Sequence, residues 1–508
     1  AIVGYPHDIK GNALYGYVIL KESGEGRNQE NLRKEINNYL EEYEKETGKD
    51  VNIYRDGLKI FVTLDSKMQK YAEEAIKEHM TSLQKSFDSE QRRNPNRPFY
   101  FLKKKQIDDI MLAAMKRTGR YKQLAAEGVS EDSIMMDFKT PTKTTIFTWE
   151  GEKETEMSPY DSIRYHKQIA QAGLMSMEPA TGDIKAWVGG IDWKHFQYDH
   201  VKQGKRQVGS TIKPFVYSTA MLMGVVKPCT MFENRDYCVD LQGPDGKIFD
   251  RWCPRNAGGS DASHVSTATG LAMSMNNITV GVMQQMGGYA GPKTIAKLLR
   301  DVDIQIRPED EVPSICLGVM DLSLYELVAA QCIFANHGIY NRPTTILRVE
   351  DRNGNVIYQA QNYSKEVLNE SVAYETLKMM KGVVNSGTAG SLRGGRSWGG
   401  ITAPTAGKTG TTQSNADGWF MGLTPELVTG VWVGAEDRSV RFRSMDWGQG
   451  ARMALPIYGY YMQKVYKDPV IALSTTDFEV PSSYDPQQFS CSEDGQIDGG
   501  TSTPDFGL

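Results

Sequence analysis

The sequence predicts an α+β domain in which the two ends of the domain contribute strands to one antiparallel sheet. Two β-hairpin patterns carry this prediction. In the first, strand-like residues 174–178 and 184–188 flank the turn sequence Pro-Ala-Thr-Gly. In the second, strand-like residues 418–423 and 427–433 flank the turn sequence Thr-Pro-Glu. The segment between the hairpins is mostly helical in pattern. Strands at both ends of a domain, with helices between them, are typical of a single sheet that is assembled from both ends of the domain.

A linker and a small accessory domain are predicted upstream, over residues 38–160. Residues 38–47 are acidic and helical in pattern, and residues 57–65 alternate as a half-buried strand does. Ser66 to about Arg93 is expected to form one long polar helix. The Asn-Pro-Asn-Arg-Pro run that follows ends the helix, because proline cannot continue it.

The rest of the accessory domain is expected to mix a short helix with two strands. The strand patterns lie at 144–149 and 154–157, and Glu-Gly-Glu separates them. The main domain is then placed at residues 161–470.

The two ends of the chain differ from its middle. Residues 1–37, which begin Ala1-Ile-Val-Gly-Tyr-Pro, resemble a fragment of the C-terminal domain of acetyl-CoA synthetase. The lysine-bearing loop of that domain is absent, so the segment is interpreted as an artefactual fusion without adenylate chemistry, and its strand-like runs are expected to lack partners. At the other end, residues 471–508 are predicted to form a polar tail, flexible from Asp485.

Composition excludes several classes of function. The 508 residues are 40% hydrophobic and 24% charged, as in globular proteins of two or three domains. A formal net charge of -5 argues against nucleic acid as a partner. The chain has no run of about 18 apolar residues, so no transmembrane helix is predicted, and no signal peptide is recognised. Without a C-x-x-C spacing or clustered histidines, no metal site is expected.

Two of the six cysteines are informative. Cys238 and Cys253 lie symmetrically about the turn Pro244-Asp-Gly-Lys247. If this segment is a hairpin, the two residues face each other and would bond in an oxidising compartment. Two unpaired thiols in a loop explain the sequence equally well.

The first of three short motifs is Ser210-Thr-Ile-Lys213. Gly209 precedes it and an apolar helical run follows, which places Ser210 at a helix N-terminus, where developing negative charge is favoured. Lys213 is three residues on and shares the face of Ser210. A buried lysine with a lowered pKa can serve as the base that a serine nucleophile needs. The same spacing at Ser82-Leu-Gln-Lys85, inside the polar helix, is interpreted as solvated surface.

The second motif, Ser274-Met-Asn276, lies between two helical runs. Its serine and asparagine are typical helix-capping residues, and capping is compatible with a role in which the hydroxyl relays a proton and the amide orients the base. The third motif, Lys408-Thr-Gly410 with Thr411, is predicted to lie on an edge strand. Such a strand can offer backbone N–H groups to a bound peptide, and Gly410 permits close approach.

Together with their surroundings, the three motifs resemble class A penicillin-binding proteins over about residues 57–467. The matching stretches are Glu178 to Gly182, Arg206 to Phe215, Gly407 to Thr412, Asp417 to Pro425 and Val431 to Gly434. The resemblance implies an antiparallel sheet with helices on both faces, a helical subdomain and a small accessory domain.

The resemblance also implies a peptidoglycan D,D-transpeptidase without metal or organic cofactor. Ser210 would attack a stem peptide ending in D-Ala-D-Ala, Lys213 would take its proton, and Ser274 and Asn276 would relay it and orient the cluster. Backbone N–H groups of Ser210 and Thr411 would form the oxyanion hole. The side chains expected to bind the terminal carboxylate are those of Lys408, Thr409 and Thr411, with Gly410 between them.

The implied partners are the D-Ala-D-Ala donor, an amine acceptor from a second stem peptide, and β-lactams that trap Ser210. The family's membrane anchor and glycosyltransferase domain are not recognised here, so the parent protein is expected at the periplasmic face of the cytoplasmic membrane by inference only. Glu366-Val-Leu-Asn369 superficially resembles the deacylating glutamate of class A β-lactamases, but the spacing differs and Asn369 is expected to cap a helix. The alternatives are a D,D-carboxypeptidase, a β-lactamase, an inactive binding or sensor module, and, from residues 1–37, a CoA or adenylate enzyme.

Overall fold

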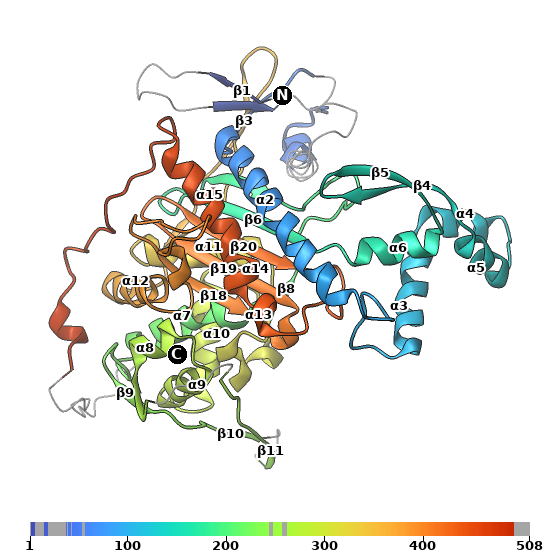
Figure 1. Ribbon diagram of the computed structural model, residues 1–508. Coiled ribbons are helices and arrows are strands. Elements are labelled where there is room, and N and C mark those ends of the chain that lie inside the picture. Colours follow the sequence, from blue (N-terminus) through green and yellow to red (C-terminus); the bar gives the residue numbers. More distant parts are fainter. Residues whose placement is uncertain are drawn as a thin grey trace.

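The core of the protein is one five-stranded antiparallel sheet that both ends of the main domain build (Figure 1). The computed structural model describes residues 2–5, 15–18, 37, 39–41, 43–52, 56–242, 247–256 and 262–491. The strand order is β18 (Ala406–Thr411), β19 (Asp417–Leu423), β20 (Val428–Gly434), β6 (Gln171–Met177) and β7 (Ile184–Val188). The pairing of β20 with β6 joins the two predicted hairpins, so the predicted α+β sheet is confirmed.

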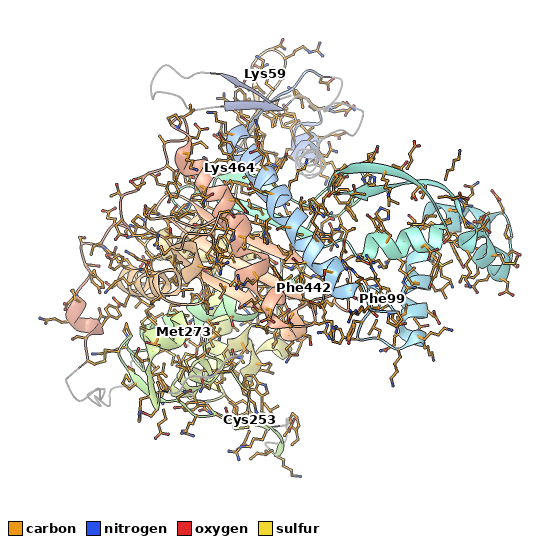
Figure 2. All side chains as sticks on the ribbon, viewed as in Figure 1. Lys59, Phe99, Cys253, Met273, Phe442 and Lys464 are labelled. Atoms are coloured by element: carbon orange, nitrogen blue, oxygen red, sulfur yellow. A yellow bond between two sulfur atoms is a disulfide. The ribbon has the colours of Figure 1, made fainter. Side chains whose placement is uncertain are left out.

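Both faces of this sheet are buried. Successive side chains along each strand point to opposite faces, so each strand contributes side chains to both hydrophobic cores. On β19, Trp419 and Met421 pack into one hydrophobic core while Phe420 packs into the other. Helix α11 (Leu324–Ala335) contacts β6 and β20 on the first face. Helices α2 (Ser66–Gln91) and α15 (Leu455–Lys467) pack together against the second face (Figures 1 and 2). The long predicted helix from Ser66 is therefore confirmed.

A helical lobe lies beside the edge strand β18. It contains α7 (Lys213–Leu222), α8 (Thr267–Ala272), α9 (Asn276–Gln285), α10 (Ala290–Asp301) and α12 (Glu370–Asn385). Asn369 caps α12 as predicted, because its side chain accepts hydrogen bonds from the backbone N–H groups of Ser371 and Val372.

Short elements connect these parts. They are β8 (Arg206–Gln207) paired with β13 (Asp321–Leu322), β9 (Met231–Glu233) with β12 (His264–Ser266), β10 (Val239–Gln242) with β11 (Ile248–Trp252), β14 (Ile339–Asn341) with β17 (Ser364–Glu366), and the helices α13 (Met445–Gly448) and α14 (Gly450–Met453).

The accessory part extends away from the sheet (Figure 1). It contains α3 (Lys104–Arg117), α4 (Gly119–Ala126), α5 (Glu131–Lys139), the hairpin β4 (Thr142–Thr148) and β5 (Gly151–Met157), and α6 (Pro159–Lys167). The two strands are confirmed, but α3, α4 and α5 stand where the sequence predicted one short helix. Helix α4 buries no residue and depends on its Thr118 cap, so it lacks the apolar stripe that identifies a helix in sequence.

A second sheet crosses the boundary that the sequence analysis placed at residue 37. Its order is β1 (Ile2–Tyr5), β2 (Tyr15–Val18), β3 (Lys59–Val62), β15 (Ile346–Glu350) and β16 (Val356–Gln359). The strand-like runs near the N-terminus therefore do have partners, since β2 pairs with β3. The edge of β3 supplies backbone hydrogen-bonding groups that any extended segment can satisfy. The rest of residues 1–37 lies outside the described residues.

Disulfide bonds fix two peripheral segments. Cys238 and Cys253 are bonded across the β10–β11 hairpin, with their Cα atoms 4.3 Å apart, which decides between the two alternatives left open by the sequence. Cys229 is bonded to Cys491. The expectation of a flexible chain from Asp485 is therefore wrong for residues 485–491. Buried Phe489 and this second disulfide hold that part of the tail, while residues beyond 491 lie outside the described chain.

Among the helices of the described residues, none combines the length and the apolar character needed to cross a membrane.

Candidate functional site

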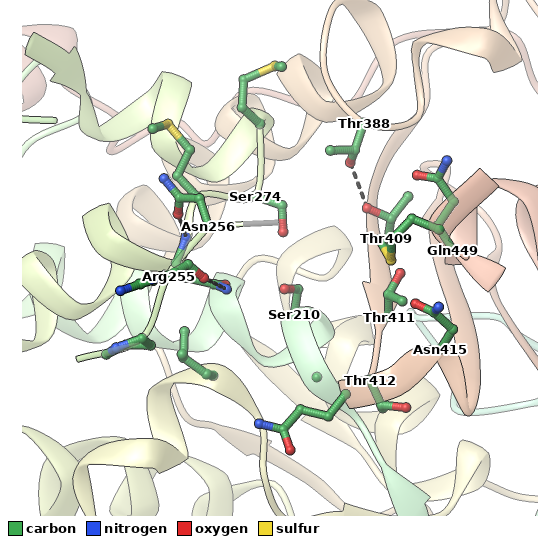
Figure 3. A pocket seen from close by; sticks show the side chains of 18 of the residues that line it. Ser210, Arg255, Asn256, Ser274, Thr388, Thr409, Thr411, Thr412, Asn415 and Gln449 are labelled. Atoms are coloured by element: carbon green, nitrogen blue, oxygen red, sulfur yellow. Dashed lines mark hydrogen bonds between the residues drawn. The ribbon is translucent and has the colours of Figure 1, made fainter. Parts of the chain in front are cut away.

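The three sequence motifs meet in one cleft of about 960 Å³ between the helical lobe and β18. Figure 3 shows Ser210 between two walls: Ser274, Asn256 and Arg255 lie on one side, and Thr409 and Thr411 on the other. The structure thus brings together predicted residues that are about 200 positions apart in the sequence.

Ser210 lies on a tight turn. It belongs to a short 3-10 helix, Gly209–Ile212, and the α-helix α7 begins at Lys213. The N-terminus of the α-helix, which was predicted at Ser210, therefore lies three residues further along the chain. Gly209 has a left-handed backbone with φ of 54°, and a Cβ there would lie 2.9 Å from the carbonyl oxygen of Thr411. A glycine is therefore required for the turn to lie this close to β18. Within the described chain the Ser210 hydroxyl has no hydrogen-bond partner, which leaves it available to a substrate.

Lys213 is fully buried directly behind the second motif. Its Nζ donates to the Ser274 carbonyl oxygen at 2.7 Å and to Asn276 Oδ1 at 2.8 Å, and it approaches Ser274 Oγ at 3.4 Å. Burial disfavours the ammonium form and lowers the pKa of Lys213 to about 7. A substantial fraction of neutral amine is thus present near neutrality, which is what a general base requires.

Ser274 lies between two buried lysines. Lys408 Nζ donates to Ser274 Oγ at 2.8 Å and to the Thr409 carbonyl oxygen at 3.0 Å. Burial, reinforced by the nearby Lys213, lowers the pKa of Lys408 well below its usual range. Because both amines approach Ser274 Oγ, the hydroxyl hydrogen of Ser274 is left for an acceptor in the cleft. Ser274 also has a left-handed φ of 56°, a strained conformation for serine that is concentrated at functional sites.

Asn276 does not cap α9, so the capping interpretation of the second motif is wrong. The N-cap position is Met275, which has no capping side chain. Asn256 provides the cap from a distant loop, because its Oδ1 accepts from the backbone N–H of Asn276 at 2.7 Å and of Asn277 at 3.1 Å. Asn276 Nδ2 in turn donates to the Arg255 carbonyl oxygen at 2.9 Å.

The loop at residues 253–256 was not predicted from the sequence to belong to the site. Its polar residues have no periodic pattern that would separate them from an ordinary loop. The one local indication was Cys253, because its disulfide bond to Cys238 holds this loop against the β10–β11 hairpin.

Ser210 is the nucleophile that the sequence predicts, and substitution of Asn256 by alanine is expected to lower the rate of its acylation by about 10- to 100-fold. Two N–H groups of α9 lose their acceptor, so Asn276 and with it Lys213 are held less accurately. Loss of a cap also destabilises a fold by about 1 kcal/mol, which corresponds to a fall in melting temperature of about 2–4 °C. Stopped-flow measurement with a chromogenic cephalosporin, together with calorimetry, checks both values.

Asn369→Ala is the matched control, because it removes the side-chain cap of α12, a helix whose N-terminus does not line the cleft. It should lower the melting temperature similarly and leave the acylation rate unchanged. An equal effect of both substitutions on acylation would contradict a positioning role for Asn256.

The third motif lies on an edge strand, as predicted, since β18 pairs only with β19 among the described strands. A Cβ at Gly410 would lie 2.7 Å from Thr211 Cγ2, so glycine allows the strand to pack against the Ser210 turn. The Thr409 and Thr388 hydroxyl oxygens are 2.6 Å apart, and Thr411 Oγ1 accepts from the Gly450 N–H at 3.0 Å. Thr409 and Thr411 line the cleft, whereas the Lys408 ammonium faces Ser274 behind its wall.

Buried Asp417 supports the end of β18. Arg206 Nε lies 3.0 Å from Asp417 Oδ1, and Trp432 Nε1 donates to the same oxygen at 3.0 Å. The other carboxylate oxygen accepts from the Thr412 hydroxyl at 3.0 Å. This network fixes the strand that carries Thr411, and the sequence analysis gave it no role.

No three His, Cys, Asp or Glu side chains gather as metal ligands among the described residues. The described lining of the cleft also contains no aspartate or glutamate. The chemistry available in the cleft is therefore that of hydroxyls, amides, backbone N–H groups, the Arg255 guanidinium and the two buried amines.

The chain matches two protein families. Residues 94–170 match the penicillin-binding protein middle domain, and residues 172–436 match the penicillin binding protein transpeptidase domain. Penicillin-binding protein 1A of Aquifex aeolicus is 29% identical over 442 residues, which is 84% of this chain and 56% of that protein. The protein of the same name from Neisseria gonorrhoeae is 31% identical over 59% of this chain and 36% of its own length. The chain thus spans about half the length of the first of these relatives.

Solved structures share the fold. Penicillin-Binding Protein 1A from Haemophilus influenzae has a TM-score of 0.60 at 20% identity, covering 85% of this chain and 70% of that one. The penicillin-binding protein PonA1 from Mycobacterium tuberculosis has a TM-score of 0.55 at 20% identity, covering 89% and 95%. At this identity the likeness concerns the fold.

Proposed function

Because this chain belongs to the penicillin binding protein transpeptidase domain family, we propose that it is a serine acyltransferase that cross-links peptidoglycan stem peptides. The observation that carries the proposal is the cluster around Ser274. The Ser210 hydroxyl, which has no hydrogen-bond partner among the described residues, shares a cleft with Ser274, whose Oγ lies within 3.4 Å of two buried lysine amines.

In the proposed reaction, Ser210 Oγ attacks the carbonyl carbon of the penultimate D-Ala, and its proton passes to the neutral amine of Lys213. The backbone N–H groups of Ser210 and Thr411 stabilise the oxyanion. The peptide C–N bond then breaks as Ser274 delivers its proton to the departing D-Ala amine and takes in its place the proton held by Lys213, whose Nζ approaches Ser274 Oγ at 3.4 Å. This leaves an ester between the stem peptide and Ser210.

An amine of a second stem peptide then attacks the ester carbonyl and forms the new amide bond, and Ser210 recovers its proton. Asn276 keeps the Lys213 amine in place throughout, through their 2.8 Å hydrogen bond. The hydroxyls of Thr409 and Thr411 bind the terminal carboxylate of the donor, with Gly410 allowing its close approach. Lys408 contributes chiefly through Ser274, since its amine is 2.8 Å from that hydroxyl.

The chain divides in this proposal into residues 1–37, an accessory part at 38–160, the transpeptidase domain at 161–470 and a tail at 471–508. The resemblance of the first segment to acetyl-CoA synthetase stays a prediction. The parent protein is proposed to work in the cell envelope, at the periplasmic face of the cytoplasmic membrane, in association with that membrane.

A β-lactamase or a D,D-carboxypeptidase would use the same serine but would need to activate water. Glu366 lies on β17, away from the residues that line the cleft, so it is not placed to do this. The described lining also contains no other carboxylate that could serve as the base for water, which favours slow deacylation.

Incubation with benzylpenicillin followed by intact mass measurement and peptide mapping tests the proposal. We expect a persistent one-to-one adduct on Ser210. Rapid drug turnover without an adduct would indicate a β-lactamase instead, and the absence of both would indicate an inactive module. Product analysis with a D-Ala-D-Ala peptide and an amine acceptor then separates transpeptidation from hydrolysis.

A further inference from the structure

We propose that Arg255 forms a subsite for a carboxylate on the acyl portion of the donor, distinct from the terminal carboxylate. The inference rests on the proposed function and specifies its substrate class. Arg255 is the only charged residue among the described residues that line the cleft. Every other side chain of that lining is neutral, so Arg255 alone can distinguish an anionic donor from a neutral one there.

Among the residues that the structure describes, the Arg255 guanidinium has no acidic partner. Neighbouring arginines are paired: Arg251 Nε lies 3.3 Å from Asp240 Oδ1, and Arg235 Nε lies 2.8 Å from Glu233 Oε2. In the described chain, by contrast, the Arg255 side chain makes no ion pair or hydrogen bond. An arginine that faces a substrate cleft without an acidic partner retains its full capacity for a ligand carboxylate.

The backbone that carries Arg255 is fixed on both sides. Two positions before it, Cys253 forms a disulfide bond with Cys238, and the next residue after it, Asn256, caps α9. The Arg255 carbonyl oxygen itself accepts from Asn276 Nδ2 at 2.9 Å. The backbone of Arg255 is therefore held by the same hydrogen bonds that position Asn276, and the side chain extends from this fixed point at the wall of the cleft.

The chemistry of a guanidinium selects its ligand. Its planar fork binds a carboxylate through two parallel hydrogen bonds, more specifically than an ammonium can. The terminal carboxylate of the donor belongs to the opposite wall, at Thr409 and Thr411 (Figure 3). A second carboxylate that reaches Arg255 must therefore lie on the other side of the scissile bond. We assign it to the side chain of the residue before D-Ala-D-Ala.

Two penicillins that differ by one carboxylate test this assignment. Carbenicillin carries on its acyl side chain a carboxylate that benzylpenicillin lacks, and both have the same reactive nucleus. The second-order acylation rate constant is measured for each with the wild-type chain and with Arg255→Gln. We expect the substitution to lower the ratio of the carbenicillin to the benzylpenicillin rate constant by about 3- to 10-fold, a modest effect because the side chain is exposed.

Three further measurements sharpen the result. Arg255→Lys keeps the charge and loses the fork, so its ratio should fall between those of the wild type and Arg255→Gln. Arg251→Gln removes a paired arginine of the same hairpin and should leave the ratio unchanged. Raised salt should lower the wild-type ratio and not that of Arg255→Gln.

Equal losses with both penicillins would mean that Arg255 only supports Asn276, and an unchanged ratio would mean that the guanidinium does not meet the ligand; either result overturns the subsite. Failure of the wild-type chain to form any adduct would instead overturn the proposed function, and the subsite with it. Benzylpenicillin acylation of the wild type therefore separates the two failures.

Discussion

Replacement of Ser210 by alanine is expected to abolish the covalent adduct with benzylpenicillin. The nucleophilic oxygen is the only atom that forms the new bond, so the loss should exceed about 10⁴-fold in acylation rate and reach the detection limit of mass measurement. The substitution removes one hydroxyl that makes no hydrogen bond within the described chain, so the melting temperature should stay the same. Intact mass measurement after incubation with the drug, alongside calorimetry, checks both expectations.

Ser82→Ala is the matched control, since Ser82 and Lys85 repeat the spacing of Ser210 and Lys213. Both residues of this copy are exposed on α2, as the sequence predicted. The adduct should therefore form at the wild-type rate. An adduct that persists in Ser210→Ala, mapped to another serine, would show that the nucleophile is wrongly assigned.

The sequence predicts those parts of the site that depend on patterns among neighbouring residues. Gly209 before Ser210 and Pro214 just after it mark a helix start, and the alternating residues of β19 and β20 mark buried strands. These patterns reflect steric and burial requirements that act within a few residues. They are the source of the predicted site residues, of which Ser210, Ser274, Asn276, Thr409 and Thr411 line one cleft, while Lys213 and Lys408 are fully buried beside it.

The rest of the site depends on contacts between distant residues. Asn256 acts on α9 across 20 positions, and Arg206 meets Asp417 across more than 200. No periodicity connects such pairs, because their partners are chosen by the folded arrangement rather than by the local chain. The Cys229–Cys491 bond is of the same kind, and for that reason the anchored tail was predicted to be flexible.

Lys408 shows how burial alters a role inferred from residue type. An exposed lysine on a strand would hold a carboxylate directly. The fully buried Lys408 instead directs its amine to Ser274 Oγ and the Thr409 carbonyl oxygen. Burial also weakens its preference for the charged form, so we interpret it as a group that tunes the proton relay.

Replacement of Lys213 by arginine is expected to reduce acylation by about 10²- to 10⁴-fold, the range that removal of a general base produces. A guanidinium stays protonated at any accessible pH, so it keeps the positive charge but cannot accept the proton of Ser210. Because arginine is larger than the fully buried lysine, a loss of folding would give the same result. The melting temperature of the variant and its ability to bind the drug non-covalently distinguish the two causes.

The pH dependence of the wild-type chain tests the same role without any substitution. Burial lowers the pKa of Lys213 to about 7, and in the proposed mechanism the active form is the neutral amine. The neutral fraction is then about a tenth at pH 6 and about nine-tenths at pH 8, so acylation should rise close to tenfold between these values and level off above them. The measurement is the second-order rate constant with benzylpenicillin across this range at constant ionic strength. A rate that falls with rising pH would mean that the charged amine is the active form, and a flat profile would mean that Lys213 does not titrate there; in either case the proton of Ser210 must leave by another route.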